Sequence, residues 1–245
     1  MASHPPAACC FKGFYHEGTP KGSIAELYDI ETYITGVASN EKVIVILTDV
    51  FGHKLKNTQM IADHLGDAGY RVYIPDILFG EALERLDGSV DFNAWKERHN
   101  VAKTKSVVDQ FLSGLKKEHS PKFVGVVGHC FGAKYAVQQI HATEGAADAC
   151  AIAHPSYVSI EELAAIGKEK PLLISAAETD AIFPPEMRHL SEEKLTEIGA
   201  RYQLDLFSGV SHGFAVRGDE NNPCVRYARN KVLLDQICWF NNFSS

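Results

Sequence analysis

A cysteine between two glycines, in residues 128–132 (Gly-His-Cys-Phe-Gly), has the residue types and spacing of a nucleophile on a sharp turn. The apolar run 122–127 before it is typical of a buried strand, and residues 131–141 begin a helical pattern. The glycines lack the Cβ atoms that would collide where a strand turns directly into a helix. A helix beginning here directs free N–H groups toward the sulfur and favours the thiolate. The sequence therefore predicts nucleophilic chemistry at Cys130.

Asp180 and His212 follow two later predicted strands, 172–176 and 202–207, so that the chain order is nucleophile, acid, histidine. Ligands of open parallel sheets bind beyond the carboxyl ends of the strands, and we expect all three side chains to meet there. Cys130 would attack an acyl carbonyl, and His212 would hold or move its proton. Asp180 would fix the imidazole tautomer and stabilise the imidazolium.

Attack on an acyl carbonyl also requires hydrogen-bond donors for the developing oxyanion. The expected donors are the backbone N–H of Phe131, directly after the nucleophile, and that of Val50, after the first core strand. Two alternatives stay open. Glu178 lies close enough to Asp180 in sequence to replace it as the acid, and Cys130 could be a small packing residue.

Predicted strands and helices alternate along most of the chain, and several of the strands are continuously apolar. This pattern predicts an α/β fold with a mostly parallel sheet of about seven to eight strands and helices on both faces. Antiparallel strands are expected within 22–36, and further strands at 43–48, 71–74, 122–127, 149–153, 172–176 and 202–207. Helices are expected at 57–69, within 92–117, and at 131–141, 159–166, 186–198 and 223–243. The long connection 78–92 is expected to overhang the active cleft.

Length and composition limit the class of protein. The 245 residues, 45% apolar and 22% charged, predict a single globular domain, 1–245, whose residues 1–21 form an N-terminal segment that could be loosely ordered. A net charge of −7 without a basic run argues against a nucleic acid or a membrane surface as partner. No stretch approaches the roughly 18 apolar residues of a membrane span, and we expect a soluble, cytoplasmic protein.

The six cysteines are scattered through a chain too large to need disulfides, which favours reduced thiols. Cys9 and Cys10 are adjacent, with no Cys-x-x-Cys or paired His/Cys spacing beside them. We therefore interpret this pair as exposed or half-buried residues without a role. The spacing predicts no metal site.

Several segments together resemble the dienelactone hydrolases, the carboxymethylenebutenolidase-like branch of the α/β-hydrolases with a cysteine nucleophile. The resemblance extends over about residues 22–243 and is carried by 48–52 (Thr-Asp-Val-Phe-Gly), 69–72 (Gly-Tyr-Arg-Val) with 75–77 (Pro-Asp-Ile), 128–132, 178–180 (Glu-Thr-Asp) and 212–214 (His-Gly-Phe). It implies the α/β-hydrolase fold and a catalytic triad of Cys130, His212 and Asp180. It also implies hydrolysis of an enol-lactone or related ester without a metal or cofactor.

Three further residues are site candidates. Asp49 stands where the bacterial members usually have a glutamate that takes the thiol proton, and it is the candidate activating acid. Arg217 lies one position later than the family's arginine, so it is a candidate to bind a substrate carboxylate, with an exposed, solvated charge as the alternative. His154, which ends the strand 149–153, is a candidate to line the pocket, with a packed turn histidine as the alternative.

The leading prediction is a hydrolase that cleaves a small-molecule ester or lactone through an acyl-thioester on Cys130. A second hypothesis is a non-catalytic protein of the same fold that binds or covalently senses a small electrophile at Cys130. A third is an inert scaffold. The pattern leaves both a monomer and a homodimer open.

Overall fold

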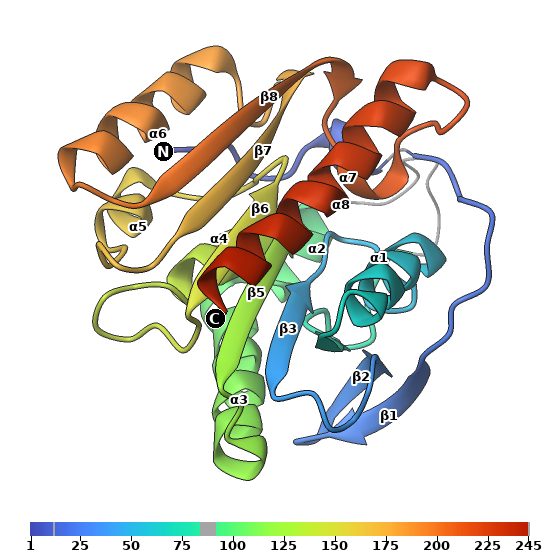
Figure 1. The fold of residues 1–245 in the computed structure, drawn as a ribbon. Coiled ribbons are helices and arrows are strands. Elements are labelled where there is room, and N and C mark those ends of the chain that lie inside the picture. Colours follow the sequence, from blue (N-terminus) through green and yellow to red (C-terminus); the bar gives the residue numbers. More distant parts are fainter. Residues whose placement is uncertain (12, 84–91, 245) are drawn as a thin grey trace.

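The core of the molecule is an eight-stranded sheet in the order β1-β2-β4-β3-β5-β6-β7-β8 (Figure 1). The computed structural model describes residues 1–11, 13–83 and 92–244. The strands are β1 (Ser23–Leu27), β2 (Ile30–Thr35), β3 (Lys42–Leu47), β4 (Arg71–Pro75), β5 (Phe123–His129), β6 (Ala149–Ala153), β7 (Leu172–Thr179) and β8 (Tyr202–Ser211). Pairing is antiparallel from β1 through β2 to β4 and parallel from there to β8. The predicted mostly parallel sheet is thus confirmed.

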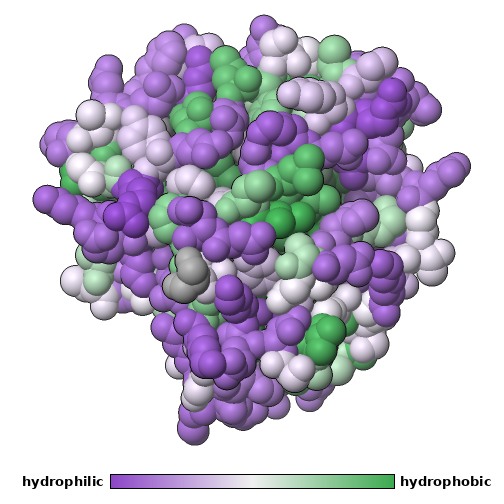
Figure 2. Space-filling model, viewed as in Figure 1, coloured by the Kyte–Doolittle hydropathy of each residue, from purple (hydrophilic) through white to green (hydrophobic). Residues whose placement is uncertain are grey.

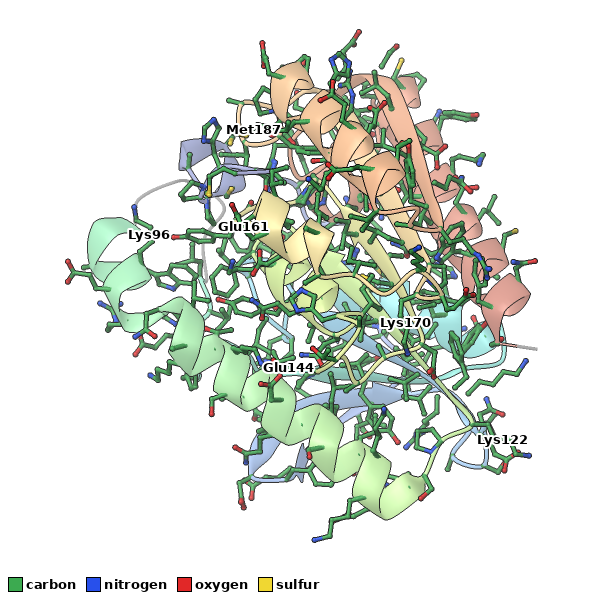
Figure 3. The ribbon with its side chains drawn as sticks, turned by 90° about the vertical axis from the view of Figure 1, so that its left-hand side faces the viewer. Lys96, Lys122, Glu144, Glu161, Lys170 and Met187 are labelled. Carbon is green, nitrogen blue, oxygen red and sulfur yellow. The ribbon has the colours of Figure 1, made fainter. Side chains whose placement is uncertain are left out.

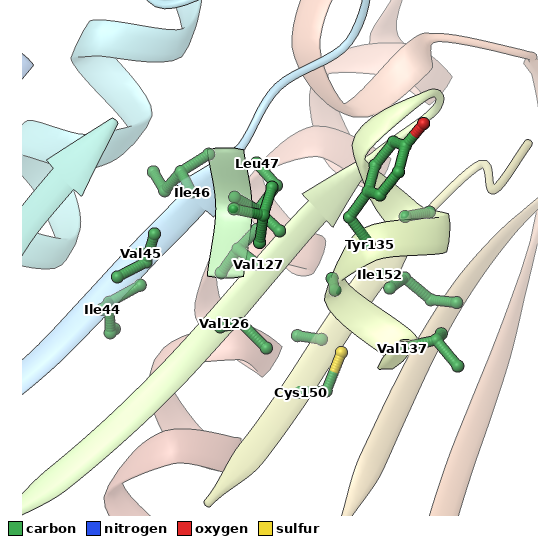
Figure 4. Packing of buried hydrophobic residues seen from close by; sticks show 14 of the residues in the cluster. Ile44, Val45, Ile46, Leu47, Val126, Val127, Tyr135, Val137, Cys150 and Ile152 are labelled. Atoms are coloured by element: carbon green, nitrogen blue, oxygen red, sulfur yellow. The ribbon is translucent and has the colours of Figure 1, made fainter. Parts of the chain in front are cut away.

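The central strands β3, β5 and β6 are buried on both faces, as their continuous apolar sequences require. β3 pairs with β5 from Lys42 opposite Phe123 to Leu47 opposite Gly128. Side chains alternate between the two faces of each strand, so both faces need a covering layer (Figure 4). The hydrophobic core therefore lies on both sides of the same three strands.

Helices supply these two layers (Figure 1). On one face lie α1 (Lys56–Asp67), the four-residue α7 (Phe214–Arg217) and α8 (Pro223–Phe243), and on the other lie α2 (Phe92–Arg98), α3 (Val101–His119), α4 (Gly132–Gln138), α5 (Ile160–Ala164) and α6 (Pro185–Glu197). The single helix expected within 92–117 is two helices. Asn100 separates them because its side chain accepts a hydrogen bond from the N–H of Lys103, 3.0 Å away, and so caps α3.

The first residues of the chain are fastened to the loops after β6 and β7. The N–H groups of Ala2 and Ser3 donate to the carbonyl of Val158, at 3.0 and 2.9 Å, and that of His4 donates to Ile182 at 2.7 Å. The 3-10 turn η1 (Ala8–Phe11) follows. This beginning of the segment 1–21, for which the sequence left loose order open, is packed against these loops. Residues 84–91 of the connection expected to overhang the cleft lie outside the described residues.

The surface is mainly hydrophilic on the face shown in Figure 2, with a hydrophobic area near its centre. On another side of the molecule, lysines and glutamates such as Lys96, Glu144 and Glu161 are interspersed (Figure 3). Within the described residues, no helix combines the length and the apolar character needed to cross a membrane.

Candidate active site

Cys130 lies on the turn between β5 and α4 with a backbone φ of +47°, in the left-handed region that a side chain disfavours. A Cβ atom at Gly128 would lie 2.6 Å from the Cα of Ala133. At Gly132 it would lie only 2.1 Å from the carbonyl oxygen of Leu47 in β3. Both glycines are therefore required for this turn to pack against the sheet, which explains the Gly-x-Cys-x-Gly spacing.

The structure brings Cys130, His212 and Asp180 together. His212 Nε2 lies 3.2 Å from Cys130 Sγ, and His212 Nδ1 donates to Asp180 Oδ2 at 2.8 Å. The other oxygen, Asp180 Oδ1, accepts the N–H groups of Ile182 and Phe183 at 2.8 and 3.0 Å. These contacts hold the carboxylate and the imidazole in one orientation. The arrangement has the connectivity of a nucleophile, base and acid triad.

Neighbouring strand ends explain how residues so far apart in sequence meet. Asp180 follows β7 and His212 follows β8, and these strands are parallel neighbours in the sheet. The N–H of His212 donates to the carbonyl of Thr179 at 3.2 Å, which joins the two loops. The alternative acid, Glu178, is exposed, and its carboxylate accepts the N–H of Gly209 instead. The geometry thus selects Asp180 as the partner of His212.

Electrostatics at the triad favours a thiolate beside an imidazolium. Burial alone would raise the pKa of Cys130, but a hydrogen bond with Cys10 and the positive charge on His212 hold that pKa well below the ordinary thiol value. Burial would likewise lower the pKa of His212. The Cys130 thiolate and the hydrogen bond to Asp180 outweigh burial and raise it to about 10. Each charge stabilises the other, so the pair titrates as a unit.

Two residues at the nucleophile were not predicted as site residues. Ser156 Oγ lies 3.2 Å from Cys130 Sγ, on the loop after β6. Cys10 Sγ lies 3.5 Å from Cys130 Sγ and 3.4 Å from His212 Nε2. Ser156 could have been found, because it follows a strand that ends at the same edge as the triad. No spacing signal leads from Cys10 to Cys130, since only the fold brings them together.

The interpretation of Cys9 and Cys10 as an exposed or half-buried pair without a role is wrong about the exposure of Cys10. Its side chain is 0% exposed, because the turn η1 inserts it beside Cys130 and His212. Cys9 is half-buried. A hydrogen bond with Cys10 lowers the pKa of the Cys9 thiol to about 6. The N-terminal turn thus brings two thiols close to the candidate nucleophile.

Asp49 and Arg217 form a buried ion pair, with Arg217 Nε donating to Asp49 Oδ2 at 2.9 Å. The second oxygen, Asp49 Oδ1, accepts the N–H of Phe51 at 3.0 Å. The alternative of an exposed, solvated charge at Arg217 is therefore wrong, since its side chain is only 1% exposed. In this structure the candidate activating acid and the candidate carboxylate-binding residue are bound to each other.

The candidate oxyanion donors and His154 complete the predicted set. Among the described residues, none accepts a hydrogen bond from the N–H of Phe131 or Val50, so these groups have no competing partner there. His154 is fully buried, and its ring stands edge-on to that of His212 with the centroids 5.1 Å apart. Burial lowers the pKa of His154, which favours a neutral ring next to the triad.

Known proteins are similar to this chain over almost its whole length. The dienelactone hydrolase family matches residues 30–244. The hydrolase tropI of Talaromyces stipitatus is 41% identical, over 99% of this chain and 98% of its own length. The hydrolase pyvD of Aspergillus violaceofuscus is 37% identical over 99% of both chains. A solved structure, a putative dienelactone hydrolase from Klebsiella pneumoniae, shares the fold with a TM-score of 0.75 at 12% identity and covers 92% of this chain and 100% of its own.

Proposed function

The chain belongs to the dienelactone hydrolase family, and from this premise we propose that it hydrolyses small esters or lactones with Cys130 as the nucleophile. The observation that carries the proposal is the continuous contact from Cys130 Sγ through His212 to Asp180, with distances of 3.2 and 2.8 Å. A buried thiolate held against an imidazolium is the form of cysteine that attacks an acyl carbonyl.

In the first step, the Cys130 thiolate attacks the substrate carbonyl and forms a tetrahedral intermediate. The N–H groups of Phe131 and Val50 are the proposed donors to its oxyanion, since neither has another acceptor among the described residues. Collapse of the intermediate breaks the C–O bond, and His212 gives its Nε2 proton to the departing alkoxide. The products of this step are an acyl-thioester on Cys130 and an alcohol, which stays attached to the acyl group when the substrate is a lactone.

In the second step, neutral His212 takes a proton from a water molecule that attacks the thioester. Cys130 leaves as the thiolate, and His212 returns to the imidazolium form. Asp180 keeps the Nδ1 proton of His212 in place throughout, because its Oδ2 accepts that hydrogen bond at 2.8 Å. Both steps use the same histidine nitrogen, first as an acid and then as a base.

The Asp49–Arg217 pair bears on the class of substrate. A substrate carboxylate that binds Arg217 would share the guanidinium with Asp49, which already holds its Nε in a buried contact and offsets its positive charge. We therefore expect neutral esters and lactones to be hydrolysed at least as well as analogues that carry a carboxylate.

The test is a panel of neutral and carboxylate-bearing esters and lactones with the wild type and Cys130→Ala. We expect the variant to lose at least about 10⁴-fold in kcat/KM, because it lacks the nucleophile. Cys224→Ala is the matched control, because Cys224 is an exposed cysteine, and it should retain the wild-type rate. Turnover that survives Cys130→Ala unchanged would overturn the assignment.

Mass spectrometry of the intact protein separates hydrolysis from covalent sensing. A hydrolase forms a transient acyl adduct on Cys130 while product accumulates over many turnovers. A protein that senses electrophiles would instead acquire one stable adduct per chain and release no product. The second outcome would favour the non-catalytic hypothesis.

A further inference from the structure

Three soft donor atoms meet beside the nucleophile: Cys10 Sγ, Cys130 Sγ and His212 Nε2. They are separated by 3.5 Å between the sulfurs, and by 3.4 and 3.2 Å from His212 Nε2 to Cys10 and Cys130. Tetrahedral zinc, with Zn–S distances of about 2.3 Å and Zn–N of about 2.0–2.1 Å, sets sulfur atoms about 3.8 Å apart and sulfur and nitrogen about 3.6 Å apart. Each of the three observed separations differs by no more than about 0.4 Å from the separation that these zinc bond lengths give.

Each of the three donor residues is also oriented by a second hydrogen bond outside the trio. The N–H of Ala7 donates to Cys10 Sγ at 3.4 Å, and Ser156 Oγ lies 3.2 Å from Cys130 Sγ. Asp180 Oδ2 accepts the Nδ1 proton of His212 at 2.8 Å, which directs Nε2 toward the two sulfurs. A carboxylate behind a histidine, together with hydrogen bonds to the sulfurs, is the usual support of a zinc site.

Cys10 forms and breaks no bond in the mechanism above, although its hydrogen bond helps to lower the pKa of Cys130. Hydrolysis requires Cys130, His212 and Asp180, whereas Cys10 supplies a second, wholly buried sulfur in contact with both reacting groups. Within the described residues, this is the only group of three or more cysteine, histidine or acidic side chains whose donor atoms converge closely enough for a metal ion.

We propose that Cys10, Cys130 and His212 bind Zn²⁺ as three protein ligands, with water in the fourth position. Binding to the resting enzyme forms two Zn–S bonds and one Zn–N bond and releases two protons, one from the Cys10 thiol and one from Nε2 of the imidazolium. The bound metal then occupies the Cys130 lone pair that would attack the carbonyl and the His212 lone pair that would accept a proton from water. Zinc thus acts as a reversible inhibitor, and this consequence rests on the proposed function.

Metal binding is measured directly with Co²⁺ as a spectroscopic probe on the fully reduced protein. We expect a thiolate-to-cobalt charge-transfer band and tetrahedral d–d bands that saturate at one equivalent and disappear when one equivalent of Zn²⁺ is added. Cys10→Ser should weaken zinc binding by more than about 100-fold, because loss of an outer hydrogen bond alone costs about 10- to 100-fold. Cys224→Ser, a change at an exposed cysteine, should bind within about threefold of the wild type, a difference too small for loss of a ligand.

A second measurement uses the wild-type protein alone, so that it does not depend on how a variant folds. Zinc should protect Cys130 from iodoacetamide, as mapped by peptide mass spectrometry, and leave the exposed Cys224 unprotected. Absence of the charge-transfer band at one equivalent, or equal zinc affinity in Cys10→Ser and the wild type, would overturn the site. Zinc binding without hydrolysis of any ester would contradict the proposed function but not the zinc site. Hydrolysis without zinc binding would contradict the zinc site but not the proposed function.

Discussion

Cys150 lies within β6, and Cys130 follows the neighbouring strand β5. Both residues are 0% exposed. Burial raises the pKa of the Cys150 thiol and is the only cause acting on it. At Cys130 the same penalty is outweighed by Cys10 and His212, and the pKa falls well below its ordinary value. Equal burial therefore accompanies a raised thiol pKa in one region and a lowered one in the other.

The difference lies in what surrounds each sulfur. Cys150 is enclosed by apolar side chains of the central sheet and of α4, including Val126 and Val137 (Figure 4). Cys130 stands at the carboxyl edge, where the loops after β6, β7 and β8 contribute Ser156, Asp180 and His212. The interior of the sheet provides rigidity, and its edge provides the polar partners that a thiolate needs.

Among the partners of Cys130 at the edge, the largest effect should come from Asp180→Asn. The isosteric amide can still accept the N–H groups of Ile182 and Phe183 through its oxygen, so the loop keeps its shape. Its NH₂ group then faces His212 Nδ1 and forces the tautomer that carries a proton on Nε2, which cannot accept a proton from Cys130 or water. We expect kcat to fall by about 10³- to 10⁴-fold with an unchanged melting temperature. A loss below about tenfold, measured by steady-state kinetics, would contradict the role of Asp180.

The acidity of the two thiols is tested by the pH dependence of alkylation with iodoacetamide, read at each cysteine by peptide mass spectrometry. Because the pKa of Cys130 is lowered, its thiolate persists below the ordinary thiol range, and its alkylation rate should stay constant as pH falls through neutrality. The rate should then drop by about tenfold per unit below the apparent pKa of the pair. Cys150 should remain unmodified in the folded protein.

Hydrolysis should depart from alkylation at alkaline pH. His212 has a raised pKa of about 10, so its imidazolium is present at neutral pH and is lost as pH rises through that value. Alkylation needs only the thiolate and continues there, whereas ester hydrolysis also needs the proton on Nε2 and should decline. A Cys130 alkylation rate that rises tenfold per unit up to about pH 8.5, as for a free thiol, would contradict the proposed pair.

The parts of the site that follow strand ends were predictable from the sequence. Cys130, Asp180 and His212 each follow a predicted strand, and in the structure they come directly after β5, β7 and β8, whose carboxyl ends lie at one edge. The sheet itself was predictable because its strands are continuously apolar and alternate with helical segments.

Contacts made by segments far apart in the chain were not predictable in the same way. Cys10 reaches Cys130 from 120 positions away, and Asp49 meets Arg217 across 168 positions. Neither pair belongs to a local periodicity, since their meeting depends on how the N-terminal turn and the loop after β8 pack. The departure of Arg217 from the family position indicated a change in this region, but only the structure reveals the buried partner.

The smallest effect on activity is expected in the interior, at Cys150, where substitution should change stability alone. Cys150→Ser places a hydroxyl among apolar side chains, and a buried hydroxyl without a partner costs about 1–3 kcal/mol. Cys150→Ala removes the sulfur and leaves a small cavity, with an expected loss of about 1 kcal/mol.

At the edge, the hydroxyl of Cys130→Ser keeps His212 and Ser156 within reach. That variant should therefore lose less stability than Cys150→Ser, although it loses the thiolate. Urea unfolding of the three variants measures this order. Two outcomes would contradict the contrast between an inert interior and a reactive edge. One is that Cys150→Ser and Cys130→Ser unfold at the same urea concentration. The other is that Cys150→Ser slows ester hydrolysis by more than about twofold, which is too large an effect for a site without a role in catalysis.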